Sequence, residues 1–200
     1  MLHTNLRSPR AHLLSVLTIA ALVLSACTTM EPYEVQGDPV QRYEGNGYTM
    51  RMEFLDEAYL RARYGQRNNT FIAPPGLTSE RFLAFELEVD ADRALRIDAT
   101  SIELQFGPSF TSAQNRFNFS QHWNYLDERE GRSGNEMQRR QDEINRTLIP
   151  NQWTFVPGQR DDGVIVFRGR LPRYGTAKVI VPIMEASGRP TERAEFEFEF

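Results

Sequence analysis

The chain has 200 residues, of which 40% are hydrophobic and 25% are charged. These proportions are those of a globular domain, and they exclude both an intrinsically disordered chain and a protein with several membrane spans. Acidic side chains outnumber basic ones by 27 to 23. This balance argues against nucleic-acid binding, because proteins that bind phosphate backbones carry a basic stripe.

Residues 1–26 have the three-part layout of a secretory signal. A weakly basic start is followed by an apolar run over residues 13–24 and then by the small residues Ser25 and Ala26. The run is shorter than the ~20 residues that a membrane-spanning helix needs. We therefore expect a signal peptide that is cleaved between Ala26 and Cys27.

The tetrapeptide Leu24-Ser25-Ala26-Cys27 resembles the lipobox of bacterial lipoproteins. In that family the cysteine is thioether-linked to diacylglycerol and becomes the new amino terminus. The alternative is an ordinary secretory signal, but Cys27 is the only cysteine of the chain and cannot form an internal disulfide. In the family an aspartate after the cysteine commonly retains the protein at the inner membrane. Because Thr28 stands there, the resemblance implies a lipid anchor in the outer membrane, on the periplasmic side.

The chain after the cleavage site divides into two parts. Residues 27–47 contain prolines and glycines among polar residues, which predicts a lipidated terminus followed by a flexible tether. From residue 48 to residue 200 apolar and polar residues alternate, as half-buried strands require. Seven segments show this pattern or are apolar on both faces, namely 48–54, 83–89, 102–106, 153–155, 164–167, 177–183 and 196–200. We expect residues 48–200 to form one β domain.

Two stretches of this domain lack the alternation. Residues 56–63 are expected to form a short helix. The larger stretch, about 121–148, is polar and contains a capping box, with Ser133 three residues before Glu136. Opposite charges also occur at the four-residue spacing that supports an exposed helix, in the pairs Glu136/Arg140, Arg139/Glu143 and Asp142/Arg146. We expect a polar helical insertion that lies on the β domain rather than inside it.

Seven antiparallel strands in about 150 residues predict an all-β fold with two packed sheets. Residues 157–167, which begin with Pro-Gly and end in an apolar strand, follow the strand at 85–89. This order resembles immunoglobulin-like extracytoplasmic domains of bacterial lipoproteins and implies an antiparallel β-sandwich without common catalytic residues. The insertion and the lack of a cysteine pair depart from that pattern. The alternative is a small outer-membrane β-barrel, since the chain ends in Glu-Phe-Glu-Phe-Glu-Phe.

Few residues of the mature chain carry catalytic chemistry. His122 is its only histidine, and we expect it to be a surface or partly packed residue rather than a base. A single cysteine and a single histidine cannot make a zinc site. The acid pairs Asp90/Asp92 and Asp161/Asp162 stand at strand ends, where aspartate favours turns. We expect no enzyme activity, no cofactor and no metal.

Aromatic residues are concentrated between positions 106 and 125. Phe106, Phe117 and Phe119 are expected to pack inside, because aromatic side chains dominate cores. The others, with arginines around them, have the composition of a protein interface. The expected interaction face comprises Phe110, Arg116, Trp123, Tyr125 and Arg129.

Together these features predict a non-catalytic envelope lipoprotein that binds a protein or cell-wall partner in the periplasm. The alternative is an envelope carbohydrate-active hydrolase or carbohydrate-binding module that uses carboxylates and aromatic side chains on loops.

Overall fold

In a computed structural model of the chain, residues 31–66 and 69–200 are described, and residues from Pro32 to Phe200 form one compact unit. The expected signal peptide and Cys27 lie outside the described residues. In chain order the elements are β1 Val40–Gly45, β2 Tyr48–Leu55, α2 Glu57–Tyr64, β3 Arg81–Ala91, β4 Leu95–Asp98, the 3-10 turn η2 Ala99–Ser101, β5 Glu103–Phe106, β6 Ser109–Ser112, α3 Arg116–Glu130, α4 Gly134–Thr147, β7 Gln152–Phe155, β8 Gln159–Gly169, β9 Thr176–Met184 and β10 Pro190–Glu199.

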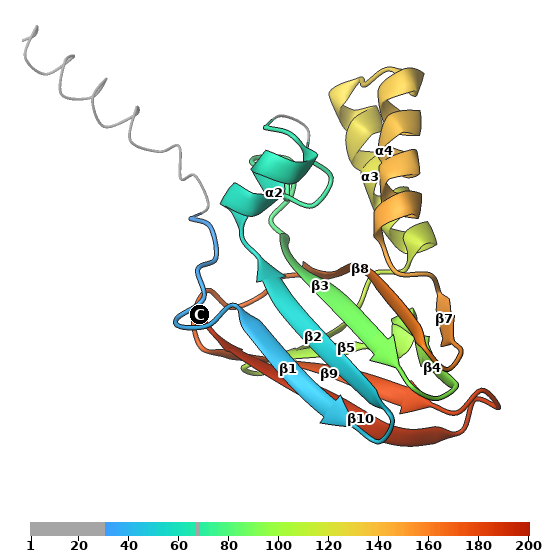
Figure 1. Ribbon diagram of the computed structural model, residues 1–200. Helices are drawn as coiled ribbons and strands as arrows, with labels where there is room; N and C mark the ends of the chain where they lie inside the picture. Colours follow the sequence, from blue (N-terminus) through green and yellow to red (C-terminus); the bar gives the residue numbers. More distant parts are fainter. Residues whose placement is uncertain (1–30, 67–68) are drawn as a thin grey trace, which may run out of the picture. The chain divides into compact units, whose positions relative to one another are not determined.

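The strands form two antiparallel sheets (Figure 1). One sheet has four strands in the order β1-β2-β3-β8. In the six-stranded sheet β9 pairs with β10 on one side and with β5 and β4 on the other, while β6 pairs with β5 and β7 with β4. Both sheets are open and end at edge strands, so the described strands do not adopt the closed barrel that was the alternative expectation. The chain is mostly β and antiparallel, and all seven expected segments are strands.

The main core lies between the two sheets. Its members are the side chains at every second position of the strands, which face inward, such as Met52 of β2, Phe85 of β3 and Val179 of β9. Phe85 is fully buried, and its ring centroid lies 5.0 Å from that of Phe198 and 5.9 Å from that of Phe167. Period-two alternation therefore places one face of each sheet against the other.

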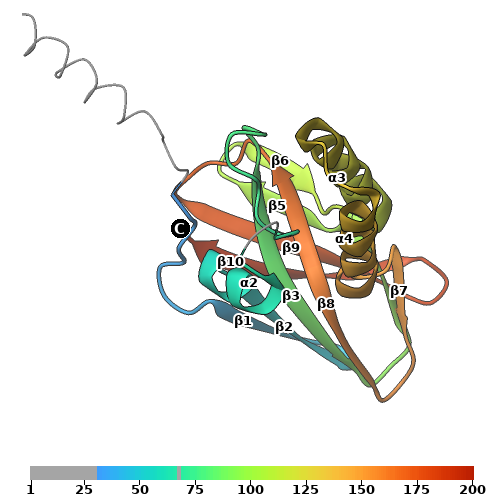
Figure 2. The same ribbon diagram turned by 90° about the horizontal axis from the view of Figure 1, so that it is seen from above.

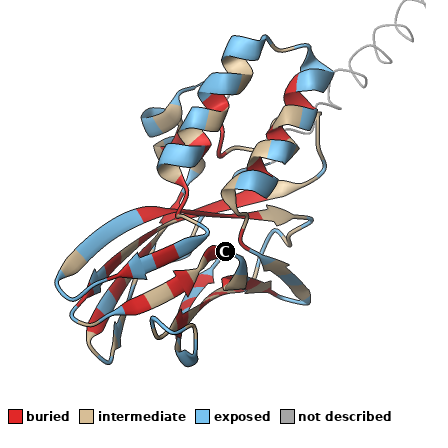
Figure 3. Cartoon of the chain, turned by 90° about the vertical axis from the view of Figure 1, so that its right-hand side faces the viewer, coloured by how far each residue is buried: buried red, intermediate tan, exposed pale blue. Residues whose placement is uncertain are grey.

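The helices cover the outer face of the four-stranded sheet (Figures 1 and 2). A second core lies between this face and the helices. It joins Phe82 of β3 and Val164 of β8 to Trp123 of α3 and Ile144 of α4. Figure 3 shows buried residues in the helices as well as in the strands. The expectation that the helical insertion lies on the β domain is confirmed, although it begins at Arg116 rather than near residue 121. The short helix expected at residues 56–63 is also confirmed, as α2.

The chain segments that flank the two long helices cover the outer edge of β8. The backbone N–H of Ile149 donates to the carbonyl oxygen of Val164 at 3.1 Å, and that of Gln114 donates to Val166 at 2.8 Å. Gly163 permits this approach, because a Cβ at that position would lie only 2.8 Å from Cγ2 of Ile149. A glycine inside a strand thus marks a close contact with another backbone.

The segment expected to be a flexible tether, residues 27–47, is folded from Tyr33 onward. Tyr33 is buried in the main core, and its hydroxyl donates to the carbonyl oxygen of Pro172 at 2.8 Å. Residues 40–45 form β1, which pairs with β2 across an Asn46-Gly47 turn. A two-residue Asn-Gly turn matches the twist of antiparallel strands, so Gly47, with a φ of 75°, closes a hairpin and is not part of a linker. Of the described helices, none combines the length and the apolar character needed to cross a membrane.

Candidate functional site

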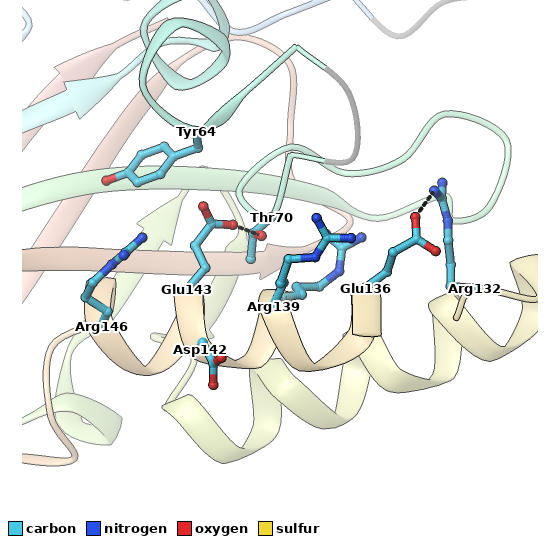
Figure 4. Close-up of a pocket in the computed structure, with 9 residues that line it drawn as sticks. Tyr64, Thr70, Arg132, Glu136, Arg139, Asp142, Glu143 and Arg146 are labelled. Carbon is cyan, nitrogen blue, oxygen red and sulfur yellow. Dashed lines mark hydrogen bonds and ion pairs between the residues drawn. The ribbon is translucent and has the colours of Figure 1, made fainter. Parts of the chain in front are cut away.

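A charged pocket lies between α4 and the segment that follows α2 (Figure 4). Its volume is about 510 Å³, within the range of about 300–1,000 Å³ that is usual for small-ligand sites. The residues that line it are Tyr64, Thr70, Arg132, Glu136, Arg139, Arg140, Asp142, Glu143 and Arg146. We call this cavity the α4 pocket.

The expected capping box begins α4 and sets one end of the pocket. The Ser133 hydroxyl accepts from the backbone N–H of Glu136 at 3.4 Å, and the Glu136 carboxylate accepts from the backbone N–H of Ser133 at 3.1 Å. Hydrogen bonds from the Ser133 backbone and hydroxyl, followed by the charge of Arg132, lower the pKa of Glu136. Glu136 is therefore held as an anion, which is the opposite of what a glycosidase general acid requires.

Charged side chains of both signs line the pocket along the length of α4. Arg139 and Arg146 are seven residues apart, so they lie on the same side of the helix, about 10 Å from each other along its axis. Glu143 stands between them. Figure 4 shows Glu143 and Arg146 extending from α4 toward Thr70 and Tyr64. The pocket can thus offer guanidinium groups and a carboxylate to one ligand.

Other contacts replace all three ion pairs expected within α4, since Glu136 pairs with Arg132 and Arg140 with Asp127. Glu143 accepts a hydrogen bond from the Thr70 hydroxyl, and Asp142 accepts from the Gln138 amide at 2.8 Å. As a result, within the part of the chain that the structure describes, neither Arg139 nor Arg146 has a carboxylate within ion-pair distance. Both arginines are exposed residues that line the pocket, and Arg139 Nε donates to a carbonyl oxygen of its own helix, that of Asn135 at 3.4 Å, so both can still bind an anionic partner.

A buried network underlies the pocket. Arg140 was expected to face solvent, but it is buried and donates to both carboxylate oxygens of Asp127 at 2.9 and 3.1 Å. Its guanidinium carbon lies 3.7 Å from the centroid of the Trp123 ring, and the indole N–H of Trp123 donates to the carbonyl oxygen of Thr70 at 2.9 Å. These contacts join α3, α4 and the segment after α2, and so fix the shape of the pocket.

The five residues of the expected interaction face lie on α3 and β6, and one of them, Trp123, is not at the surface. Tyr125 and Arg129 lie together on α3, with the guanidinium carbon 5.6 Å from the ring centroid. Arg116, at the start of α3, donates through Nε to the carbonyl oxygen of Leu148 at 3.0 Å and so joins the two ends of the helical pair. Trp123 is buried and does not contribute to a surface. Phe110 is 68% exposed on β6.

One aromatic expected in the core lies on the surface instead. Phe117 is 67% exposed, whereas Phe106 and Phe119 are buried as expected. The reason is helical geometry: α3 begins at Arg116, and Phe119, not Phe117, shares a helix face with Trp123.

His122 packs away from the α4 pocket. Its Nδ1 lies 2.6 Å from a guanidinium nitrogen of Arg168, which can only donate, so Nδ1 accepts and the imidazole is neutral. Burial, and then the charge of Arg168, lower the pKa of His122, while Glu80 raises it to a lesser extent. This is the partly packed histidine that the sequence indicated.

Asp161, one of the acids expected at a strand end, has a structural partner. Asp161 accepts from the indole N–H of Trp153 at 2.9 Å. In residues 31–66 and 69–200, no three side chains of the kinds that bind metals gather in one place.

These features define a mostly β protein of two antiparallel sheets, with a helical layer and a charged pocket on one sheet. No protein-family model, no curated protein and no solved structure matches the chain. Its function is therefore inferred from its own residues.

Proposed function

We propose that this protein is a lipid-anchored bacterial envelope lipoprotein, held in the outer membrane and facing the periplasm. The observation that carries the proposal is the sequence Leu24-Ser25-Ala26-Cys27 directly after an apolar run of signal-peptide length. Two or three acyl chains on Cys27 would make the attachment permanent, since each buried CH₂ contributes about 0.8 kcal/mol. Thr28 in place of aspartate favours the outer membrane.

We propose further that the two sheets are an immunoglobulin-like sandwich. The two segments that carry this resemblance are neighbours in space, because β3 pairs with β8 and Phe85 lies opposite Ile165. Aligned sandwiches have sheets that cross at about 30°. An experimental structure with that angle would support the assignment, and sheets crossing near 90° would oppose it.

The role we propose for the domain is non-catalytic binding of a periplasmic protein or cell-wall peptide, with the α4 pocket as the binding site. The support is the exposed, carboxylate-free guanidinium groups of Arg139 and Arg146 beside the carboxylate of Glu143. Guanidinium groups bind carboxylates through paired hydrogen bonds, and peptides supply carboxylates and amines together. A ligand with both charge signs suits this pocket.

The anchor is tested by Cys27→Ala in cells fed labelled palmitate. The substitution removes the acceptor sulfur, so we expect no label and an accumulated, unprocessed precursor, whereas the wild-type chain is labelled and shortened. A matched control, Thr28→Ala, leaves the sulfur in place and is expected to be labelled normally. Palmitate retained by Cys27→Ala would show that the cysteine is not the attachment site.

The binding role is tested with a photo-crosslinking amino acid at position 142, on the rim of the pocket, in the full lipidated chain in cells. We expect a defined adduct with an envelope component that falls at least tenfold when Arg139 and Arg146 are both changed to Ala. The control variant changes Arg42 and Arg193, which lie outside the pocket. An adduct that is equally strong in all three proteins would rule out the α4 pocket as the binding site.

A further inference from the structure

We propose that the end of the domain where the chain enters the fold rests on the lipid surface, with Tyr174 at the level of the headgroups. This inference rests on the proposed lipid anchor at Cys27. It adds an orientation and a lipid-contacting surface to that anchor. We call this end of the domain the entry end, and define it by Tyr33, the loop of residues 170–175 and the carboxyl-terminal Phe200.

The entry end is defined by the contacts of Tyr33. The ring of Tyr33 packs against Phe200 with 5.4 Å between centroids, and its hydroxyl bonds to Pro172. The guanidinium carbon of Arg81 lies 4.9 Å from the Tyr33 ring centroid. Two backbone hydrogen bonds between Gly175 and Phe200, 3.0 and 3.1 Å long, hold the loop beside the carboxyl terminus. Tyr33 is thus a fixed point of the fold.

The chain between the anchor and this fixed point is short. Only residues 28–32 separate Cys27 from Tyr33. A fully extended chain covers at most about 3.3–3.6 Å per residue, so Tyr33 lies within about 20 Å of the lipidated sulfur. A domain of this size is about 40 Å across. The anchor therefore keeps the entry end toward the bilayer, which a tether of twenty residues would not do.

The entry end carries side chains that suit a lipid surface. Tyr174 is 66% exposed, and the guanidinium carbon of Arg173 lies 4.8 Å from its ring centroid. Arg170 is exposed, and residues 170–175 contain no acid. Tyrosine concentrates at membrane interfaces, where its ring is apolar and its hydroxyl is hydrated. Arginine is attracted to anionic headgroups.

The turn between β9 and β10, at the opposite end of the domain, is the reference position for distance from the bilayer. β9 starts at the entry end and runs for nine residues, so the turn after it lies about 30 Å away. That turn contains the exposed Ser187. An anchored domain in the proposed orientation holds Ser187 far from the bilayer.

The test uses the full, lipidated chain with one engineered cysteine. In the lipidated chain the sulfur of Cys27 is a thioether and cannot react with a thiol-specific label. A cysteine placed at the exposed position 176 by Thr176→Cys, two residues from Tyr174, therefore reacts selectively with a nitrobenzoxadiazole label. The matched control is Ser187→Cys. Both proteins are placed in phosphatidylethanolamine and phosphatidylglycerol vesicles that contain lipid with a nitroxide headgroup. We expect the label at position 176 to be quenched at least threefold more than the label at position 187.

The outcomes separate this inference from the proposed function. Mass spectrometry of the purified chain shows beforehand whether Cys27 carries lipid, and an unmodified Cys27 would overturn the anchor itself. Equal quenching at positions 176 and 187 in the lipidated chain would overturn the orientation alone. In the Thr176→Cys protein, Tyr174→Asp is expected to reduce quenching at least twofold, because the charged side chain leaves the headgroup region. Unchanged quenching would overturn the lipid contact of Tyr174.

Discussion

Asp127→Ala should destabilise the helical layer strongly. The Asp127 side chain is 1% exposed and is the carboxylate that pairs with Arg140, whose side chain is 7% exposed. Removing it leaves the Arg140 guanidinium buried without this counterion, beneath the α4 pocket. Breaking a buried ion pair by removing one partner costs about 3–5 kcal/mol. This is a large part of the roughly 5–15 kcal/mol by which a typical domain is stable.

Urea unfolding measures this loss, and the two tryptophans report on different layers. Trp123 lies in the second core and Trp153 in the core between the sheets. With Trp153→Phe in the background, fluorescence reports on the helical layer alone. A urea m-value of about 2 kcal/mol/M converts the expected loss into a fall of about 1.5–2.5 M in the midpoint.

The control is Asp142→Ala, which removes an exposed carboxylate from α4. Surface substitutions usually change stability by less than about 0.5 kcal/mol, or about 0.25 M in this assay. The double variant Asp127→Leu with Arg140→Leu should be less destabilised than Asp127→Ala, because no charge stays buried. If Asp127→Ala lowers the midpoint no more than Asp142→Ala, the buried pair does not hold the helical layer and the reasoning fails.

Two further predictions concern Gly163 and His122. Gly163→Ala should cost about 1–3 kcal/mol, because its Cβ meets Ile149, while Gly134→Ala, with open space around it, should cost nothing; equal melting temperatures would contradict this. The folded-state pKa of His122 is lowered by burial and by Arg168, with Glu80 the opposing charge, so the native state favours the neutral ring. The contribution of His122 to the free energy of unfolding should be constant above about pH 6.5 and decline as pH falls below that value, since the unfolded chain binds the proton more readily. Between pH 7.5 and pH 5.5 the urea midpoint should therefore fall further in the wild type than in His122→Gln. Equal falls in the two proteins would contradict the lowered pKa of His122.

The strands could be predicted where the alternation was long enough to see. Residues 164–167 are apolar throughout, and the structure places Ile165 in the core between the sheets and Val166 beneath the helices. β6 contains a single large apolar residue, Phe110, and so has no alternation to recognise. In β4 Leu95 and Ile97 alternate with Arg96 and Asp98, a signal as clear as that of β7, so this strand could have been predicted. β1 had a recognisable signal, the Asn46-Gly47 pair between Tyr43 and Tyr48, which is typical of a tight hairpin. The glycines and prolines nearby favoured a tether instead.

The pocket could be predicted only in part. The capping box located the start of α4, because it is a local signal. The partner of Glu143 is Thr70, 73 residues away, and no spacing rule reveals such a contact. Arg140 did leave a trace in the sequence: it continues the four-residue spacing of Ile144 and Leu148, the buried side of the helix. A charge on an apolar stripe indicates a buried partner, which here is Asp127.

The most direct test of the whole account is the intact mass of the native protein extracted from bacterial membranes with detergent. The account predicts a chain that begins at Cys27 and is heavier than the bare polypeptide by a diacylglyceryl group, with or without a further acyl chain on the amino terminus. A chain that begins elsewhere, or that begins at Cys27 without any added lipid, would contradict the anchor and the orientation built on it.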